Sequence, residues 1–288
     1  MERVKVFIGL LRVKHWIKNG LIFLPIIFNG SLFSIQKLYT VFLGAIIFSI
    51  CASLVYVIND IRDVEKDRLN TRKKHRPLAS GRIRIRSAIL VVAVVFVLAI
   101  MLGVVVNLSV MSWVYLGIYL AINIVYSFGA KDIPIVDITI LTAGFVLRVL
   151  FGAEVVGVGV SSWLYLSVLA GALYLGLGKR RGELLSEGTG SRKVNKYYTI
   201  EFLDKNMYVS ITLLFVFYSL WAVGPGSVHT HNAYLTIPLL IIVFMLYSLT
   251  IEKSSSSGDP VEVLTSNRLL LSMAAVFILA TILVVYLP

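Results

Sequence analysis

Directly after a long apolar stretch, the sequence carries four side chains that could bind a metal ion: Asn59, Asp60, Asp63 and Asp67. On an α-helix these positions fall within about a quarter-turn, so the helix would present one oxygen-rich face. Mg²⁺ prefers carboxylate, carbonyl and phosphate oxygens. The spacing therefore predicts that Asp60, Asp63 and Asp67, helped by Asn59, bind Mg²⁺ and act in catalysis. The alternative is a solvated helix end whose acids pair with nearby arginines and lysines.

The loop after these acids is rich in cations as far as residue 86. Arg72 and Arg76 would be one helical turn apart, and we expect them to bind the oxygens of a polyphosphate through paired N–H donors. For the remaining cations of this loop, contact with anionic lipid is the better explanation.

Two lysines, Lys14 and Lys18, precede the first apolar stretch at the spacing of one helical turn. They could meet a phosphate headgroup at the membrane surface. A plain interfacial anchor, with Trp16 between them, explains the same pattern equally well.

Four polar residues, Tyr126, Lys131, Asp137 and Arg148, occur around the fourth and fifth apolar stretches. Asp137 and Arg148 would lie on one face of a membrane-spanning helix, and charged groups there must face the bundle interior or a wet cavity. We expect all four to contribute to substrate binding. A structural role in holding helices together is the alternative for the two charged residues on the helix.

A second cationic group follows the sixth apolar stretch and consists of Lys179, Arg180 and Arg181, with Glu183 close behind. It would lie at the mouth of the bundle, so the pattern predicts a second anion site. In a soluble helix the same spacing of Lys179 and Glu183 would be an ordinary surface pair.

Apolar stretches of this length require a membrane. The 288-residue chain is 58% hydrophobic, with a mean hydropathy of +0.88, well above a soluble domain. The pattern predicts an all-α polytopic membrane protein, forming a single domain over residues 1–288. Nine transmembrane helices are expected near residues 17–33, 38–58, 87–106, 109–128, 133–156, 161–178, 207–224, 233–251 and 268–287.

The distribution of lysine and arginine predicts the orientation. With a cytoplasmic amino terminus, every lysine and arginine except Lys37 and Arg148 falls on the cytoplasmic side, as the positive-inside rule requires. The carboxyl terminus is then outside. The two long cytoplasmic loops, 59–86 and 179–206, carry the predicted site.

The net charge of +12 does not indicate nucleic acid, because the basic residues lie in loops between spans. Anionic lipids and anionic substrates are the expected partners. Cys51 is the one cysteine in the sequence, which excludes an internal disulfide and a thiolate metal site. A homo-oligomer is compatible with this pattern, which does not fix the number of subunits.

The Asn-Asp-x-x-Asp-x-x-x-Asp motif after the second of nine spans resembles the UbiA superfamily of intramembrane prenyltransferases, whose aspartate motifs hold Mg²⁺ and a diphosphate. Within it, the run 12–19, the Arg76-Pro77 pair, the stretch 131–148 and the segment 179–184 are similar to decaprenyl-phosphate phosphoribosyltransferases. The resemblance implies transfer of phosphoribose from phosphoribosyl pyrophosphate to a polyprenyl phosphate at the plasma membrane, for the cell envelope.

Prenyl-diphosphate users in this superfamily usually carry a second aspartate motif after span six, whereas this chain has no aspartate between Lys179 and Asp204. One acidic and one basic cluster suit two anionic substrates, which favours phosphoribosyl transfer. The main alternative is transfer of a prenyl group to an aromatic or quinone-precursor acceptor. A transporter is the third hypothesis, although its charges would be expected near the membrane midplane.

Overall fold

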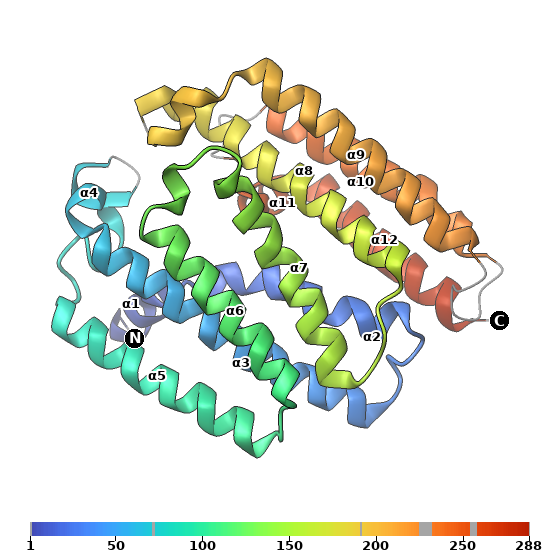
Figure 1. The fold of residues 1–288 in the computed structure, drawn as a ribbon, viewed down its shortest axis with the longest axis horizontal. Coiled ribbons are helices and arrows are strands. Elements are labelled where there is room, and N and C mark those ends of the chain that lie inside the picture. The colour runs from blue at the N-terminus through green and yellow to red at the C-terminus, as the bar shows by residue number, and fades with distance from the viewer. Residues whose placement is uncertain (1, 71–72, 191, 225–231, 254–257, 288) are drawn as a thin grey trace.

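The computed structural model describes residues 2–70, 73–190, 192–224, 232–253 and 258–287, and all regular structure in these ranges is helical. Long helices run alongside one another and the chain reverses direction between them (Figure 1). Seven described segments are long and apolar enough to cross a membrane: α3 (Ile35–Arg62), α5 (Ile85–Val105), α6 (Val110–Ser127), α7 (Val136–Val156), α9 (Ile200–Val223), Ala233–Glu252 and α12 (Arg268–Tyr286). Ala233–Glu252 comprises η6 (Ala233–Thr236) and most of α10 (Ile237–Lys253).

The first expected helix has a different form. In place of one helix over 17–33, the chain forms a 3₁₀ helix, η1 (Val13–Phe23), and a short α-helix, α2 (Leu24–Phe28). Pro25 lies at the start of α2, where its missing N–H costs nothing, so an α-helix can begin there but cannot run through it. The predicted bounds were therefore wrong for this segment.

The sixth and seventh expected helices are longer than their apolar parts. α8 (Ser162–Glu187) continues past residue 178, and α9 begins at Ile200 rather than near 207. Ser161 and Thr199 cap the two helices, accepting hydrogen bonds from the N–H groups of Leu164 and Phe202. Much of the expected loop 179–206 is thus helical, and α8 is not among the seven segments.

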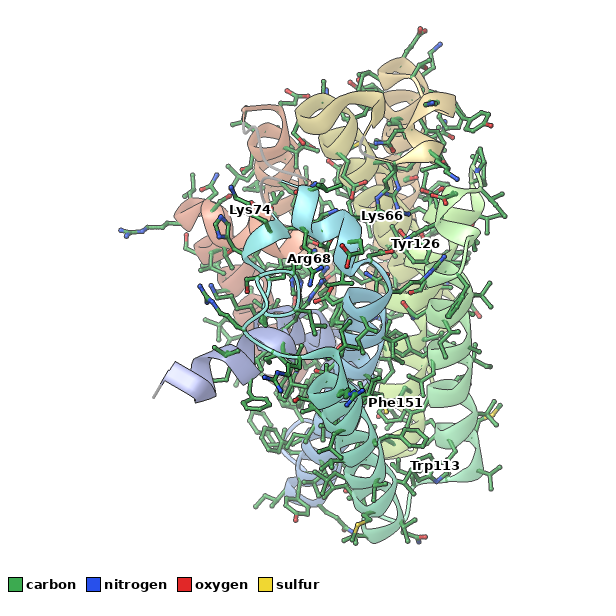
Figure 2. All side chains as sticks on the ribbon, turned by 90° about the vertical axis from the view of Figure 1, so that its left-hand side faces the viewer. Lys66, Arg68, Lys74, Trp113, Tyr126 and Phe151 are labelled. Carbon is green, nitrogen blue, oxygen red and sulfur yellow. The ribbon has the colours of Figure 1, made fainter. Side chains whose placement is uncertain are left out.

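Short helices complete one end of the bundle. They are α1 (Glu2–Leu10), α4 (Val64–Leu69), η2 (Lys73–His75), η3 (Ala130–Asp132), η4 (Gly188–Gly190), η5 (Lys193–Tyr197) and α11 (Pro260–Ser266). In Figure 1, α4 and the chain after α8 lie toward the same side, far from the carboxyl end. Figure 2 shows Lys66, Lys74 and Tyr126 toward this end and Trp113 toward the other. We call it the polar end.

The core is densest where η1 and α2 lie against α3 and α7. Ile22, Phe48 and Phe151 are almost completely buried there. A Cβ atom added to Gly152 would lie 2.1 Å from the carbonyl oxygen of Ile22, so only glycine allows the backbones of α7 and η1 to approach this closely. This contact fixes η1, and the residues that precede it, relative to α7.

The outer surface of the bundle is apolar over long stretches. On α5, for example, the side chains of Leu90, Val97 and Met101 are exposed. A continuous apolar exterior is unfavourable in water and suits contact with lipid.

Candidate functional site

The three aspartates lie where α3 passes into α4, and we call them the aspartate cluster. The N–H of Asp63 donates to the carbonyl oxygen of Asn59 at 2.9 Å, and the N–H of Asp67 donates to that of Asp63 at 2.8 Å. These helical hydrogen bonds carry the backbone through the junction without a sharp turn. As a result, Asp60 and Asp67 lie close enough to bind the same cation.

Each carboxylate of the aspartate cluster binds a cation. Nη1 of Arg76 lies 2.6 Å from Oδ2 of Asp67 and 3.1 Å from Oδ1 of Asp60. Arg12 also donates to Asp60, and Nζ of Lys131 lies 2.8 Å from Oδ2 of Asp63. The acids are therefore paired, but two of the three partners are remote in sequence rather than on the same helix turn.

The donor set suits magnesium bound together with a substrate. Among the residues that the structure describes, no three histidine, cysteine, aspartate or glutamate side chains converge as an all-protein metal site. Asp60 and Asp67 nevertheless share one nitrogen of Arg76, so a positive group already fits between their oxygens. Mg²⁺ commonly uses one or two carboxylates and completes its shell with water and phosphate oxygens. The pair therefore fits a magnesium–diphosphate better than a bare ion.

A second cluster surrounds Arg180, whose side chain is 0% exposed. Its three guanidinium nitrogens donate to different partners: Nε to Asp137 at 2.5 Å, Nη2 to the hydroxyl of Tyr126 at 2.7 Å, and Nη1 to Glu183. The structure thus joins four of the expected residues, from α6, α7 and α8. A buried guanidinium requires this degree of pairing to offset its lost hydration.

Two further residues in this cluster were not expected from the sequence. Arg192 donates to the Tyr126 hydroxyl at 3.0 Å and lies 3.1 Å from Glu183. Tyr198 donates to Asp137 at 2.6 Å and accepts from the N–H of Ile135, also at 2.6 Å. We call the group comprising Tyr126, Asp137, Arg180, Glu183, Arg192 and Tyr198 the arginine cluster.

Ile135 adopts an unfavourable backbone conformation just before α7, with φ +69°. A β-branched residue rarely adopts positive φ, and such strain persists only where the surroundings impose it. Here the Tyr198 hydroxyl binds the N–H of Ile135, so the same tyrosine holds both the strained turn and Asp137.

Burial and charge set the protonation of the groups that lie outside the seven candidate spans. Burial alone would raise the pKa of Glu183, but Arg180 and Arg192 outweigh it and hold that pKa below its usual value. Burial, followed by the hydrogen bond to Asp137, raises the pKa of Tyr198. At neutral pH, Glu183 is therefore charged, and the Tyr198 hydroxyl keeps its proton and donates a hydrogen bond.

A third group forms at Asp259, which precedes α11. Nζ of Lys18 lies 2.9 Å from Oδ2 of Asp259, and Nζ of Lys179 lies 3.7 Å from the same oxygen. Burial would raise the pKa of Asp259, but the two lysines lower it overall. Lys18 and Lys179, two of the lysines expected to bind anions, thus meet at a carboxylate that the sequence analysis did not single out.

Arg148 lies apart from these clusters, inside the bundle. Its guanidinium donates to the Asn19 side chain at 2.7 Å, to the carbonyl of Gly144 at 2.5 Å and to the Tyr119 hydroxyl at 3.2 Å. Asp137, expected on the same helix face, binds Arg180 instead. The observed contacts of Arg148 therefore connect η1, α6 and α7.

The remaining expected residues are placed individually. Arg181 binds Asp204 at 2.5 Å, while Lys14 is exposed and Asn59 is half-buried. Arg72 lies outside the described residues.

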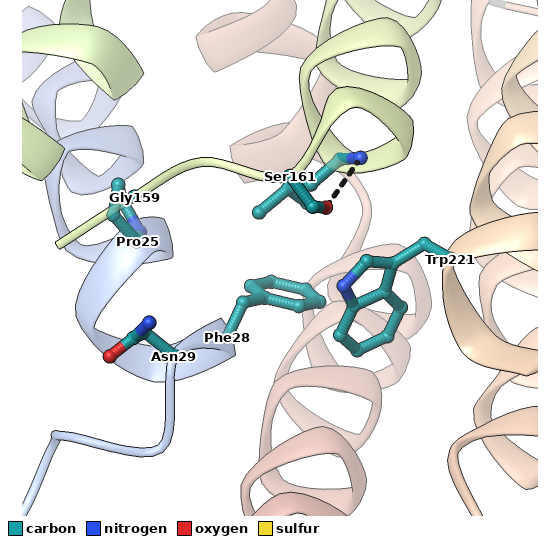
Figure 3. Close-up of a pocket in the computed structure, with 7 residues that line it drawn as sticks. Pro25, Phe28, Asn29, Gly159, Ser161 and Trp221 are labelled. Carbon is teal, nitrogen blue, oxygen red and sulfur yellow. Dashed lines mark hydrogen bonds between the residues drawn. The ribbon is translucent and has the colours of Figure 1, made fainter. Parts of the chain in front are cut away.

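A pocket of different character lies away from the polar end, between α2, the start of α8 and α9 (Figure 3). Phe28 and Trp221 contact each other across it, with ring centroids 4.7 Å apart. Its lining consists of Pro25, Phe28, Asn29, Gly159, Ser161, Leu164 and Trp221. None of these residues is charged, so the pocket does not suit phosphate chemistry.

Comparison with known proteins gives consistent matches. A family model described as the UbiA prenyltransferase family matches residues 23–266. The chain is 30% identical to a decaprenyl-phosphate phosphoribosyltransferase of Corynebacterium glutamicum, covering 96% of this chain and 85% of that one. It is 31% identical to the protein of the same name from Mycobacterium tuberculosis, covering 93% and 90%. Among solved structures, a UbiA homolog from Archaeoglobus fulgidus bound to GPP and Mg²⁺ aligns with a TM-score of 0.71 at 20% identity, covering 97% of this chain and 99% of that one.

Proposed function

The chain belongs to the UbiA prenyltransferase family, as a multi-pass membrane transferase, and we propose that it transfers 5-phosphoribose from phosphoribosyl pyrophosphate to a polyprenyl phosphate. Relatives whose alignments cover nearly the whole of this chain are named decaprenyl-phosphate phosphoribosyltransferases. The lipid is expected to be decaprenyl-like, and pyrophosphate is released.

One observation carries the proposal: the polar end brings together carboxylates suited to a metal-bound diphosphate and a separate set of cations. Asp60 and Asp67 converge on a single cationic group, whereas Lys18 and Lys179 converge on one carboxylate. Two sites of opposite character support a reaction between two phosphate-bearing substrates.

The reaction requires one bond to break and one to form. The bond between the ribose anomeric carbon and pyrophosphate breaks, and its electron pair leaves with pyrophosphate. An oxygen of the lipid phosphate then bonds to the same carbon, which has oxocarbenium character in the transition state. A phosphate monoester is already ionised at neutral pH, so no side chain is needed as a general base.

The aspartates and Asn59 are assigned to the diphosphate end of the donor. Mg²⁺ held by Asp60, Asp63 and Asp67 would supply positive charge to the leaving pyrophosphate. Arg12, Arg76 and Lys131 now bind these carboxylates. Once the carboxylates hold the metal, these cations can donate to phosphate oxygens.

The arginine cluster is assigned a positioning role beside this site. Each guanidinium nitrogen of Arg180 already donates to a protein group and the side chain is 0% exposed, so a substrate could reach it only if this buried cluster opened. Arg192 is more exposed and can contact substrate from the rim of the cluster.

We further propose nine membrane crossings, with η1 and α2 forming the first and α8 the sixth. The amino terminus and the polar end would then face the cytoplasm, at the plasma membrane, and the carboxyl terminus would lie outside. The concentration of lysine and arginine at the polar end supports this orientation. The bilayer would contribute anionic lipid, and a homo-oligomer is compatible with the arrangement.

The deciding experiment offers ribose-labelled phosphoribosyl pyrophosphate, a polyprenyl phosphate and Mg²⁺ to the purified protein. We expect label in the organic phase, and we expect a chelator to abolish it. A parallel reaction with labelled prenyl diphosphate and an aromatic acceptor tests the main alternative. Label in lipid from the second reaction alone would show that the donor assignment is wrong.

A further inference from the structure

The 3₁₀ geometry of η1 places basic residues in a row. Because a 3₁₀ helix has three residues per turn, side chains three positions apart lie above one another. His15 and Lys18 therefore share one face of η1, and Arg12 directly precedes the helix. Arg12 binds Asp60 at one end of this row, while Lys18 binds Asp259 at the other. The row thus begins at the aspartate cluster and ends in the third group.

Asp259 is held in position by its backbone as well as by its charge. Gly258 has φ +69°, and a Cβ atom there would lie 2.7 Å from the carbonyl oxygen of Gly178, so this backbone packs directly on α8. The other carboxylate oxygen of Asp259 accepts from the N–H of Val261 at 3.0 Å and caps α11. Its Oδ2 is therefore fixed between Lys18 and Lys179.

His15 adds a polar atom without a partner. Its Nδ1 is buried and has no hydrogen bond among the residues that the structure describes. An imidazole ring can donate an N–H to an anion.

The charges in this group do not balance. Two ammonium groups face one carboxylate oxygen, and the side chains of Lys18 and Asp259 are only 13% and 15% exposed. Water therefore satisfies the excess positive charge poorly, and a dianion would satisfy it better than one carboxylate does.

We propose that Lys18, Lys179 and His15 form a subsite for a phosphate monoester, and that the Asp259 carboxylate holds the place of this phosphate until it binds. The phosphate would take over the contacts that Oδ2 makes with the two lysines, while Oδ1 continues to cap α11. The inference rests on the proposed function for the source of the monoester, which is either the lipid phosphate or the 5-phosphate of the ribose.

Direct binding tests the subsite without catalysis. Geranyl phosphate and ribose 5-phosphate are titrated separately into the purified protein in detergent, with a chelator present so that the aspartate cluster holds no metal. We expect Lys18→Gln and Lys179→Gln each to weaken binding of one probe by about tenfold. The probe affected identifies the source. Lys205→Gln is the control, because Lys205 is 72% exposed and pairs with Glu201 on the surface of α9.

Asp259→Asn separates an occupied anion site from an ordinary ion pair. Asparagine can still cap α11 but no longer repels an anion, so we expect it to tighten binding several-fold. An ordinary structural ion pair would not produce such a gain. The proposal is overturned if either lysine variant binds both probes as the wild type does, or if Asp259→Asn weakens binding.

The binding result is independent of the reaction assay. If phosphoribosyl transfer fails while geranyl phosphate binding depends on both lysines, the proposed donor is wrong and the subsite stands. If transfer succeeds while neither lysine affects binding of either probe, the proposed function stands and the subsite is wrong.

Discussion

In the aspartate cluster, each carboxylate faces a cation that water can reach, whereas in the arginine cluster the central cation is sealed from water. The side chain of Arg76 is 26% exposed, and that of Arg180 is 0% exposed. Arg76 lies in a loop, whereas Arg180 lies within α8. The first arrangement allows partners to exchange at modest cost, whereas the second cannot lose a partner without leaving a buried charge.

This difference separates binding from positioning among residues that looked alike in sequence. Asp60, Asp67, Asp137 and Arg180, for example, are all charged groups near the ends of apolar stretches. Exposure and the number of engaged donors distinguish the two roles, and each role makes a different quantity sensitive to mutation: turnover and substrate affinity in the aspartate cluster, and stability in the arginine cluster.

The largest expected effect is on stability, for Arg180→Gln. The change leaves Asp137 and Glu183 without their main counter-charge inside the protein, and removing one partner of a buried pair costs about 3–5 kcal/mol. Thermal unfolding in a single detergent measures it. Arg181→Gln is the neighbouring control, because its partner Asp204 is more exposed, and it should cost about 1 kcal/mol or less. Equal losses in the two variants would remove the contrast.

The next effect is on catalysis, for Asp67→Asn. Asparagine keeps the size and one oxygen of the side chain but loses the charge that attracts a metal, so turnover should fall on the order of a hundredfold. The unfolding temperature should change little. The label-transfer assay measures the loss, and Glu65→Gln, an exposed acid on the same helix, is the control. Normal turnover in Asp67→Asn would exclude a catalytic role for this carboxylate.

A smaller effect on stability is expected for Tyr198→Phe. The hydroxyl binds both Asp137 and the strained Ile135, and its removal should cost about 1–3 kcal/mol because the N–H of Ile135 loses its acceptor and Asp137 loses one of its donors. Tyr197→Phe is the matched control, since Tyr197 is 70% exposed. If the two tyrosine variants unfold at the same temperature, the arginine cluster does not depend on this hydroxyl.

The smallest effect is expected for Arg76→Gln. If Arg76 moves from carboxylate to phosphate, its loss should raise the KM for phosphoribosyl pyrophosphate by about tenfold, with little change in unfolding temperature. Lys74→Gln, an exposed cation in the same loop, serves as the control. A drop in stability as large as that of Arg180→Gln would show that Arg76 is structural.

Hydropathy predicted most helices well but not all of their ends. α3, α5, α6, α7 and α12 begin and end within a few residues of their expected bounds. The end of α8 was missed because hydropathy predicts only the part of a helix that lies in the hydrocarbon core of the membrane. A helix can continue into water through charged residues such as Lys179 and Arg181. The close approach of η1 to α7 at Gly152 joins residues far apart in the sequence, so no local pattern contains it.

The composition of the site was easier to predict than its pairings. Helical spacing indicates which aspartates share a face, but the contact of Lys131 with Asp63 depends on how distant helices pack. Arg192 and Tyr198 lie in a segment between α8 and α9 that has no regular apolar period. For Asp259 a signal existed: an aspartate followed by proline is a typical helix start, and it marks α11.

The partners of Arg148 have a consequence for how the chain enters the membrane. An arginine at the centre of a helix costs about 2.5–3.5 kcal/mol to insert from the translocon. Asn19 and Tyr119, which accept hydrogen bonds from its guanidinium, both precede Arg148 in the chain and leave the ribosome before it. The order of synthesis therefore lets α7 meet its polar partners as it arrives, so that its arginine need not wait unpaired in lipid.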